Sequence, residues 1–313
     1  MRTQNLFIFN FDMKKFILKI LLFSVAFLMT TIGLGLFLPP TPRASKSLLF
    51  AKIKKDSLLI STISPRIIFV GGSNLSFGLN SKTIKDSLKL NPINTAIQGA
   101  IGLQHMMDNT IQYVNQGDIV VLAPEYEHFY GSFVYGGEEL LRTVVDVKFL
   151  QLKLLQVKSI YKFIPKLSFS KLNPFEYFGF EESDIYSVNS FNEFGDVYTH
   201  FGMKQREFST DEVLTEYNPH TIDLINDFRI NTEKKGATLY VTYPGYQASS
   251  FDKRIKQIKR IEKELLNSEF ELLGTPERYR MSDTLMFNTP YHLLKEGINH
   301  RTQLLIEDIR NND

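Results

Sequence analysis

The chain of 313 residues contains no cysteine and no tryptophan. The absence of cysteine excludes disulfide bonds, thiolate catalysis and metal sites built from cysteine. The sequence also lacks an excess of positive or negative charge. It has 36 Lys and Arg residues and 34 Asp and Glu residues, for a formal net charge of +2. Nucleic-acid-binding proteins carry a strongly basic footprint, so we expect no nucleic-acid partner. The hydrophobic share of 43% is that of an ordinary globular protein and excludes extensive disorder.

One long apolar segment lies near the N-terminus. Residues 20–38 carry no charge, and residues 16–38 carry only Lys19, which is long enough to cross a bilayer core. The prolines of the following "PPTP" run end a helix there. No A-x-A-like cleavage site follows, so a retained signal anchor is favoured over a cleaved signal peptide.

Basic residues stand on both sides of this segment, so the positive-inside rule does not decide its orientation. A short basic tail before a first apolar segment usually stays in the cytosol. We therefore expect a single-pass protein of a bacterial inner membrane, with its large domain in the periplasm or outside. The expected parts are a cytoplasmic tail (1–15), a transmembrane anchor (16–38), a stalk (39–64) and one large domain (65–313). The basic "KIKKDS" run near residue 54 is interpreted as solvated stalk and not as a lipid patch.

Short apolar runs alternate with amphipathic segments along the large domain. Strands are expected at residues 66–70, 93–97, 118–123, 237–243 and 270–273. Most of these runs are apolar throughout, as in strands that are covered on both faces. Helices are expected between and after them, at residues 81–90, 103–115, 249–266 and 293–309. The alternation predicts an α/β fold with a doubly wound, three-layer parallel sheet.

A long insertion, at about residues 137–217, separates the third expected strand from the fourth. Residues 138–164 have a helical pattern, and residues 165–202 are irregular and rich in aromatic residues. Insertions of this length are usually functional or act as lids. The aromatic residues of "NPFEYFGF" fit either a surface that stacks on sugar rings or the core of a subdomain.

The first expected strand runs into "GGSNLSFG". Two glycines permit a sharp turn and a close backbone approach, and Ser73 then stands where open α/β sheets place their ligands. A glycine turn with a serine helix cap fits the same residues. A serine nucleophile needs a base, which is most often histidine. Of the six histidines, His292 lies in the loop before the last helix, which the topology returns to the end of the first strand.

The "GGSNLSFG" block together with the late "YHLLKEG" block resembles the SGNH (GDSL-type) hydrolase superfamily, from about residue 66 to the C-terminus with the insertion apart. The resemblance implies an SGNH/flavodoxin-like fold, with Ser73 as nucleophile and His292 as its base. It also implies that the backbone N–H groups of Ser73 and Gly99 stabilise the oxyanion. The chain is similar to membrane-anchored members that modify cell-envelope polymers. The implied partners are a polysaccharide or acylated glycan and a multispanning membrane acyltransferase, and no cofactor is implied.

The acid of the family's catalytic histidine block is absent. The residue three positions before His292 is a threonine, and Asn288 precedes that threonine. An asparagine can orient an imidazole but cannot stabilise its charged form, which lowers turnover by about 10⁴ in the serine-protease template. Asp283 is the nearest acid upstream and is the alternative orienting group. Glu296 is a further alternative, although its place one turn into the helix predicts that it faces water.

The block after the third expected strand also departs from the family. "APEYEHF" stands where the family supplies an asparagine that donates to the oxyanion, with Glu125 near that position. A carboxylate opposes an oxyanion unless it is protonated, and losing one donor lowers the rate by roughly 10²–10³. Asn74 is the candidate donor in its place, and simple turn chemistry is its other interpretation. We expect Glu125 and Tyr126 to contact the substrate.

These patterns predict a serine-dependent esterase or O-acyltransferase that acts on a cell-envelope or exported polysaccharide through an acyl-serine intermediate. The alternative is a catalytically decayed scaffold or glycan-binding protein of a membrane acylation or export complex. A phosphate-binding domain is disfavoured, because neither G-x-x-x-x-G-K-[ST] nor G-x-G-x-x-G is present. No metal site is expected, because no two histidines have the spacing of metal ligands.

Overall fold

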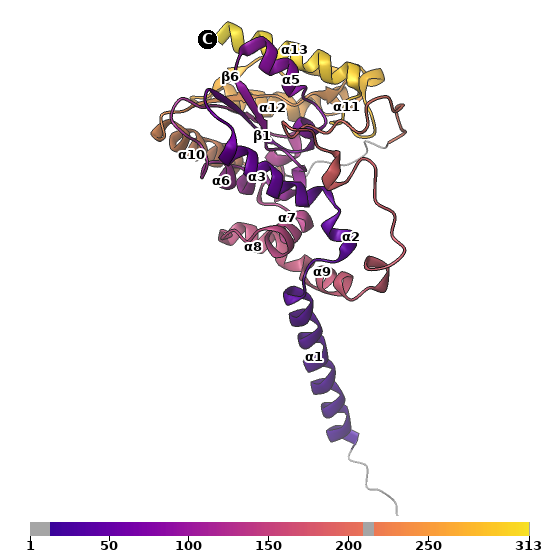
Figure 1. The fold of residues 1–313 in the computed structure, drawn as a ribbon. Coiled ribbons are helices and arrows are strands. Elements are labelled where there is room, and N and C mark those ends of the chain that lie inside the picture. Colours follow the sequence, from indigo (N-terminus) through magenta and orange to yellow (C-terminus); the bar gives the residue numbers. More distant parts are fainter. Residues whose placement is uncertain (1–12, 209–215, 313) are drawn as a thin grey trace, which may run out of the picture.

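The computed structural model describes residues 13–208 and 216–312 of the chain. These residues form a mixed α/β domain around a parallel five-stranded sheet (Figure 1). The five expected strands are the five strands of this sheet, and each neighbouring pair is parallel. The sheet order is β2 (Asn91–Asn94), β1 (Arg66–Gly71), β3 (Ile119–Ala123), β4 (Thr238–Thr242) and β6 (Glu271–Leu273).

Helices cover both faces of the sheet, because successive residues of a strand point to opposite faces. Ile68 and Val70 of β1 belong to the larger hydrophobic cluster, and Ile67 and Phe69 belong to the smaller one. Each of these side chains is fully buried, and burial of one contributes about 1.5–3 kcal/mol. The smaller cluster includes residues of α5 (Ser81–Leu88) and α13 (Lys295–Asn312); the larger one includes residues of α3 (Ala51–Ser61), α6 (Leu103–Thr110), α10 (His220–Lys234) and α12 (Ile255–Leu266).

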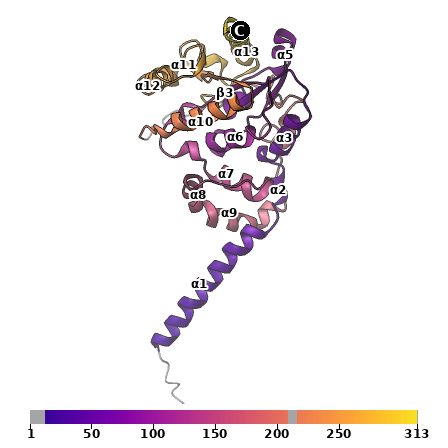
Figure 2. The same ribbon diagram turned by 90° about the vertical axis from the view of Figure 1, so that its left-hand side faces the viewer.

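The helical part of the segment between β3 and α10 lies between the sheet and the N-terminal helix (Figures 1 and 2). The expected helix over residues 138–164 is broken by an extended stretch at residues 148–153. In place of one helix, this part of the chain forms α7 (Glu138–Arg142), the π-helical η5 (Thr143–Val147), α8 (Leu154–Ile160), η6 (Tyr161–Phe163) and α9 (Ile164–Lys171). Part of the expected insertion, residues 209–215, lies outside the described residues.

Shorter elements complete the described chain. The short helices are α2 (Pro42–Ser45), η1 (Leu48–Phe50), α4 (Ser73–Ser76), η2 (Gly99–Ile101), η3 (Tyr126–Phe129), η4 (Phe133–Tyr135), η7 (Pro174–Glu176), η8 (Val188–Ser190), α11 (Ala248–Lys253) and η9 (Asp283–Leu285). Two strands of two residues each, β5 (Tyr246–Gln247) and β7 (Arg280–Met281), pair beside the main sheet. The expected helix over residues 249–266 is therefore two helices, α11 and α12.

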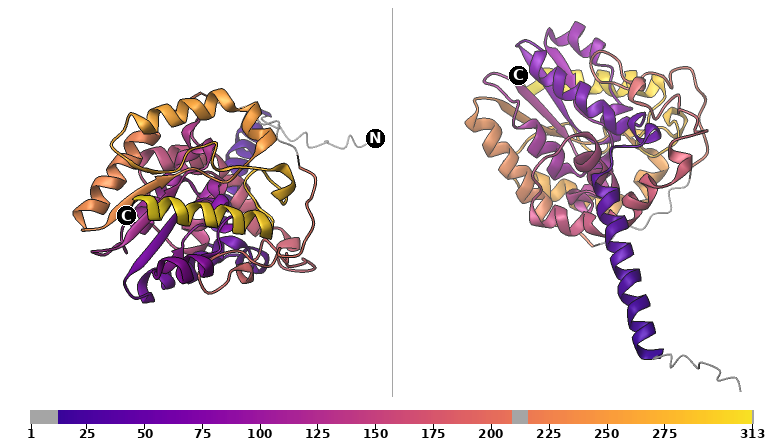
Figure 3. Two further views of the ribbon diagram at one scale, coloured as in Figure 1. Left: turned by 90° about the horizontal axis from the view of Figure 1, so that it is seen from above. Right: turned by 60° about the horizontal axis from the view of Figure 1, so that its bottom comes forward.

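The N-terminal helix α1 (Met13–Phe37) stands out from the domain (Figures 1 and 3). Within the described residues it is the one helix long and apolar enough to cross a membrane. It coincides closely with the expected anchor at residues 16–38. The expected tail at residues 1–15 lies mostly outside the described residues.

The prediction of a solvated stalk at residues 39–64 is wrong for helix α3. Lys52 and Lys55 of the basic run are 5% and 2% exposed. The Nζ of Lys55 donates to the carbonyl oxygens of Asn94 (3.0 Å), Gly195 (2.8 Å) and Ala96. Lys52 binds the carboxylate of Asp56 one turn later. Burial of a lysine requires such partners, and most of these acceptors lie far away in sequence, where a local charge pattern does not reveal them.

Candidate active site

Ser73 begins the short helix α4 directly after β1, at the carboxyl edge of the sheet. Gly72 joins the two elements in an extended conformation. A Cβ at Gly72 would overlap Glu125 Oε1 and lie 2.8 Å from the Cα of Gly99. The glycine is therefore required because two other segments meet the chain at this point, and not for a turn alone.

Glu125 follows β3 and reaches Ser73 across the strand ends. Its Oε1 accepts a hydrogen bond from the Oγ of Ser73 (3.1 Å) and one from the backbone N–H of Asn74 (3.0 Å). A Cβ at Gly99 would overlap its other oxygen, Oε2. The carboxyl group thus occupies the space between the three segments where the sequence predicts the oxyanion donors.

The pKa of Glu125 is raised from 4.5 to about 7. Burial is the main cause, because the residue is 5% exposed and its charged form loses hydration. The neighbouring carboxylate of Glu127 raises the pKa further, while the hydrogen bonds from Asn74 and Ser73 act in the opposite direction. Near neutral pH, Glu125 therefore exchanges between a carboxylate and a neutral acid that can itself donate a hydrogen bond.

His292 lies in the loop before α13, and Asn288 orients its ring. The Nδ1 of His292 is 2.9 Å from the Oδ1 of Asn288. The Nδ2 of Asn288 donates to the hydroxyl of Tyr186 at 2.5 Å. With the amide in this orientation its Oδ1 faces Nδ1 of His292, so Nδ1 carries the proton and Nε2 is left as the basic nitrogen. Burial lowers the pKa of His292 to about 3, with a smaller effect of His200, so its imidazole is neutral near neutral pH.

The histidine loop and the serine segment pack directly against each other. The ring of His292 stacks on Phe77, four residues after Ser73, with centroids 4.0 Å apart and an interplanar angle of 11°. The backbone N–H of Leu293 donates to the carbonyl of Phe77 (3.1 Å). His200, from the segment after β3, bonds the carbonyl of Leu293 through Nε2 (2.9 Å). The fold thus brings together two segments that are more than 200 residues apart.

Ser73 and His292 both line a cavity of about 750 Å³. They share no hydrogen bond, because the Oγ of Ser73 donates to Glu125. A second cavity, of about 840 Å³, is lined by Ser73, Gly99 and Glu125. Ser73 therefore stands at the junction of two spaces that are each large enough for a small-molecule or glycan ligand.

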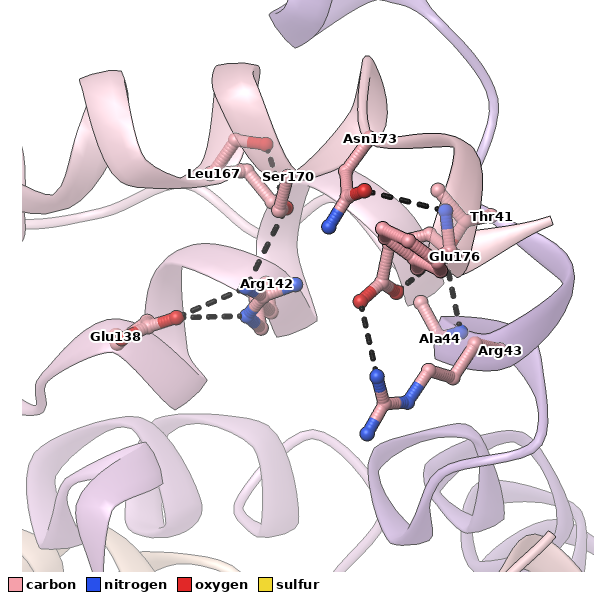
Figure 4. A network of polar contacts seen from close by, with 10 residues as sticks. Thr41, Arg43, Ala44, Glu138, Arg142, Leu167, Ser170, Asn173 and Glu176 are labelled. Carbon is pink, nitrogen blue, oxygen red and sulfur yellow. Dashed lines mark hydrogen bonds and ion pairs between the residues drawn. The ribbon is translucent and has the colours of Figure 1, made fainter. Parts of the chain in front are cut away.

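Arginine side chains of the first cavity are held by a polar network (Figure 4). Arg142 binds the carboxylate of Glu138 (3.0 and 2.9 Å). Glu176 accepts hydrogen bonds from Thr41 (3.2 Å) and Arg43 (3.4 Å). These contacts tie the segment after α1 to the segment after β3, so the two segments together form a wall of this cavity.

Three predicted site residues have other roles. The side chain of Asn74 donates to the carbonyl of Ala123 (3.0 Å), so its backbone N–H, and not its amide, faces the site. Tyr126 is 1% exposed and packs edge-on against Tyr246, so it is a core residue and not a substrate contact. Asp283 accepts from the backbone N–H of Ser249 (2.9 Å) and does not orient His292.

Gly99 begins η2, the short helix after β2, and Glu296 is exposed on α13 as expected. The carbonyl of Gly99 is 3.0 Å from the Nε2 of His128, a residue that the sequence reading missed. The Nδ1 of His128 accepts from the backbone N–H of Glu125 (3.0 Å), three residues earlier. The Glu-x-x-His spacing of Glu125 and His128 is typical of a helix-capping pair and could have predicted this contact. Tyr186 and His200 were also missed, because no local pattern ties them to a loop about 100 residues later.

No group of three metal-ligating side chains occurs within residues 13–208 and 216–312. What the site does contain is a hydroxyl, a neutral and oriented imidazole, and a carboxyl group with a pKa near neutrality. This set can transfer a proton and form a covalent acyl intermediate without a metal. Comparison with protein families, curated proteins and solved structures finds no match to the chain, so the case for a function rests on this geometry.

Proposed function

We propose that the chain is an SGNH-like esterase or O-acyltransferase that works through an acyl-serine intermediate. One observation carries the proposal: Ser73 and a neutral, amide-oriented His292 line one cavity at the carboxyl edge of a parallel sheet. The order β2-β1-β3-β4-β6 supports a doubly wound sheet, in which ligands bind outside the strand ends. The segment at about residues 137–217 is then an insertion in that fold.

In this mechanism the Nε2 of His292 removes the proton from the Oγ of Ser73 as the oxygen attacks an ester carbonyl. The tetrahedral intermediate collapses to an acyl-serine, and the leaving alcohol takes the proton from the imidazolium. Water or a sugar hydroxyl then attacks the acyl group, with His292 again accepting and returning a proton. Hydrolysis and transfer differ only in which of these acceptors reaches the acyl-serine.

Glu125 controls the developing oxyanion in this scheme. Its carboxyl group accepts the hydrogen bond of the Asn74 backbone N–H, so the backbone N–H groups of Ser73 and Gly99 are the proposed oxyanion donors. An ionised Glu125 would repel the oxyanion, whereas a protonated Glu125 can donate a hydrogen bond to it. The pKa of about 7 keeps a substantial neutral fraction at physiological pH.

A glycan is the substrate class that we infer. The two cavities beside Ser73 together are far larger than an acetyl group, and Phe133 and Tyr186 among their lining residues offer rings that can pack on sugars. The single anchor α1 would hold the domain on the periplasmic or outer face of a bacterial inner membrane. A multispanning acyltransferase in the same membrane is the proposed donor of acyl groups.

A scaffold or glycan-binding protein is the second candidate. It is favoured by the hydrogen bond from Ser73 to Glu125, which leaves the serine without its base. A serine held in this way is not activated until the hydroxyl turns towards His292. The two candidates differ in one property, because only the enzyme forms a covalent bond at Ser73.

Hydrolysis of p-nitrophenyl acetate by the full chain in detergent tests the proposal. We expect turnover by the parent, and loss of turnover in Ser73→Ala and in His292→Ala. Ser61→Ala and His300→Ala are the matched controls, because both residues are exposed and neither lines a cavity beside Ser73. Turnover that survives in Ser73→Ala would overturn the mechanism, and a folded parent without turnover would favour the scaffold.

A further inference from the structure

The segment that begins with α8 and ends two residues after η7 exposes an unusual number of large apolar side chains. Phe175 and Phe178 are each 77% exposed. Others of the same kind are Leu154, Val157, Tyr161, Phe169 and Leu172, at 45–67% exposed. Scattered apolar residues are normal on a surface, but a run of them along one segment marks an interaction site. We call residues 154–178 the basal segment.

The basal segment packs against the end of α1, where α1 leaves the domain (Figures 1 and 2). The Oγ of Ser168 in α9 donates to the carbonyl of Ile32 in α1 (3.0 Å). The Nζ of Lys171 donates to the carbonyl of Leu38 (2.7 Å). These two hydrogen bonds, to Ile32 and Leu38, fix the position of the basal segment along the axis of α1.

These contacts lie inside the part of α1 that a membrane would cover. Residues 20–38 are 19 uncharged residues, which span about 28 Å of helix against a hydrocarbon core of about 30 Å. Ile32 stands about 9 Å below the end of that stretch. A helix bonded to Ile32 is therefore held about 9 Å below the headgroup boundary, within the depth of about 5–10 Å to which interfacial helices bury their apolar face.

The charge of the basal segment suits the same surface. Residues 154–178 contain four lysines and one acidic residue, Glu176, which is paired with Arg43. Lys158, Lys162 and Lys166 are exposed, and Lys171 is buried against α1 and Asp146. Exposed lysines beside aromatic and aliphatic side chains are the composition of segments that lie in the plane of an interface rich in anionic lipid.

We propose that the basal segment inserts its apolar side chains into the interface of the bilayer that α1 crosses. The domain then has two membrane contacts, α1 and the basal segment, and cannot tumble about the end of α1. Glu176 of the basal segment and its partner Arg43 both line the cavity that contains Ser73. The cavity is thereby held next to the membrane surface. The inference is independent of the chemistry at Ser73.

The lack of tryptophan allows a direct test. Phe175→Trp and Phe178→Trp each place a single fluorophore in the full chain, which is reconstituted in lipid nanodiscs. Leu266→Trp is the matched control, because Leu266 is 65% exposed at the end of α12, at the end of the domain away from α1 (Figure 1). Lipids brominated near the headgroup end of the acyl chain quench only tryptophans that lie among them.

We expect Phe175→Trp and Phe178→Trp to emit at shorter wavelength than Leu266→Trp and to lose most of their fluorescence in brominated lipid. The Leu266→Trp variant should keep its fluorescence. Equal and weak quenching of all three variants would overturn the inference and would leave the apolar surface to a protein partner. Activity at Ser73 has no bearing on either result.

Discussion

Glu125 is the side chain that most changes the chemistry expected at the serine. Its carboxyl group occupies the place of an oxyanion donor, yet burial raises its pKa to about 7, so its neutral form is accessible. The neutral form can donate to an oxyanion, and the charged form cannot. In the proposed mechanism, the protonation state of Glu125 therefore decides whether the oxyanion is stabilised, and its titration makes predictions for both stability and activity.

The stability of the protein should depend on Glu125 between pH 4.5 and 7. The pKa of this carboxyl is higher in the folded chain than in the unfolded chain, so the folded state binds more protons over this range. Its stabilising contribution is complete below pH 4.5 and is lost as the pH rises through 7, by ~3 kcal/mol. The Glu125→Gln variant cannot ionise at this position and keeps its stability over this range. The free energy of unfolding in urea, variant minus parent, should therefore increase as the pH rises. A difference that stays constant with pH would contradict the assignment.

The esterase activity of the parent should fall as the pH rises through about 7, because ionised Glu125 repels the oxyanion. His292, with a pKa of about 3, stays neutral over the same range and adds no second transition. Glu125→Gln should remove this fall. The measurement is kcat/KM for p-nitrophenyl acetate from pH 5 to 9 in both proteins. Identical pH profiles would show that Glu125 is not the titrating group.

Asn288 is the second residue with a sharp prediction. Asn288→Asp places a carboxylate 2.9 Å from the Nδ1 of His292, where it stabilises the imidazolium that forms in the reaction. We expect kcat to increase, by up to about 10⁴ if the site behaves as the serine-protease template does. A new fall in activity at acid pH should accompany the gain, because the carboxylate raises the pKa of His292. Tyr186→Phe, which removes only the partner of the amide Nδ2, should not increase kcat.

Among the structural elements, the strands were the easiest to predict. β1 and β3 are short apolar runs between breaking residues, and that pattern is set by burial on both faces. The two-residue strands β5 and β7 were not predicted, because a pair of residues has no periodicity. Helix α12 was predicted as one unit with α11, since the break at Arg254 accompanies an ion pair with Glu127, which is 127 residues away.

Helix α3 was wrongly predicted to be a solvated stalk, because most of the acceptors that bind Lys55 lie far away in sequence. Lys55→Met leaves three buried carbonyl oxygens without the amine that donates hydrogen bonds to them. We expect a loss of ~3 kcal/mol in the free energy of unfolding, measured by urea denaturation of the full chain in detergent. Lys82→Met, at an exposed position of α5, should change it by less than about 0.5 kcal/mol. Equal effects of the two substitutions would show that α3 is not docked through Lys55.

For the whole molecule, the sequence predicted Ser73 and His292 as members of the candidate site but did not predict the contacts that surround them. Ser73 and His292 were predicted from their places after the first strand and before the last helix, which topology brings to one edge. The hydrogen bond from Ser73 to Glu125 was not predicted, because it depends on the close packing of Glu125 against two glycine-containing segments. The support from Tyr186 and His200 comes from the long segment after β3, whose path no local pattern encodes.

The central claim is that Ser73 is a nucleophile activated by His292. Its most direct test is covalent labelling of the full chain with a serine-directed fluorophosphonate, followed by mass spectrometry of the digested protein. We predict a single adduct on the peptide that contains Ser73, no adduct in Ser73→Ala, and much slower labelling in His292→Ala than in His300→Ala. An intact, folded chain that carries no adduct at Ser73, or that labels equally fast without His292, would contradict the account.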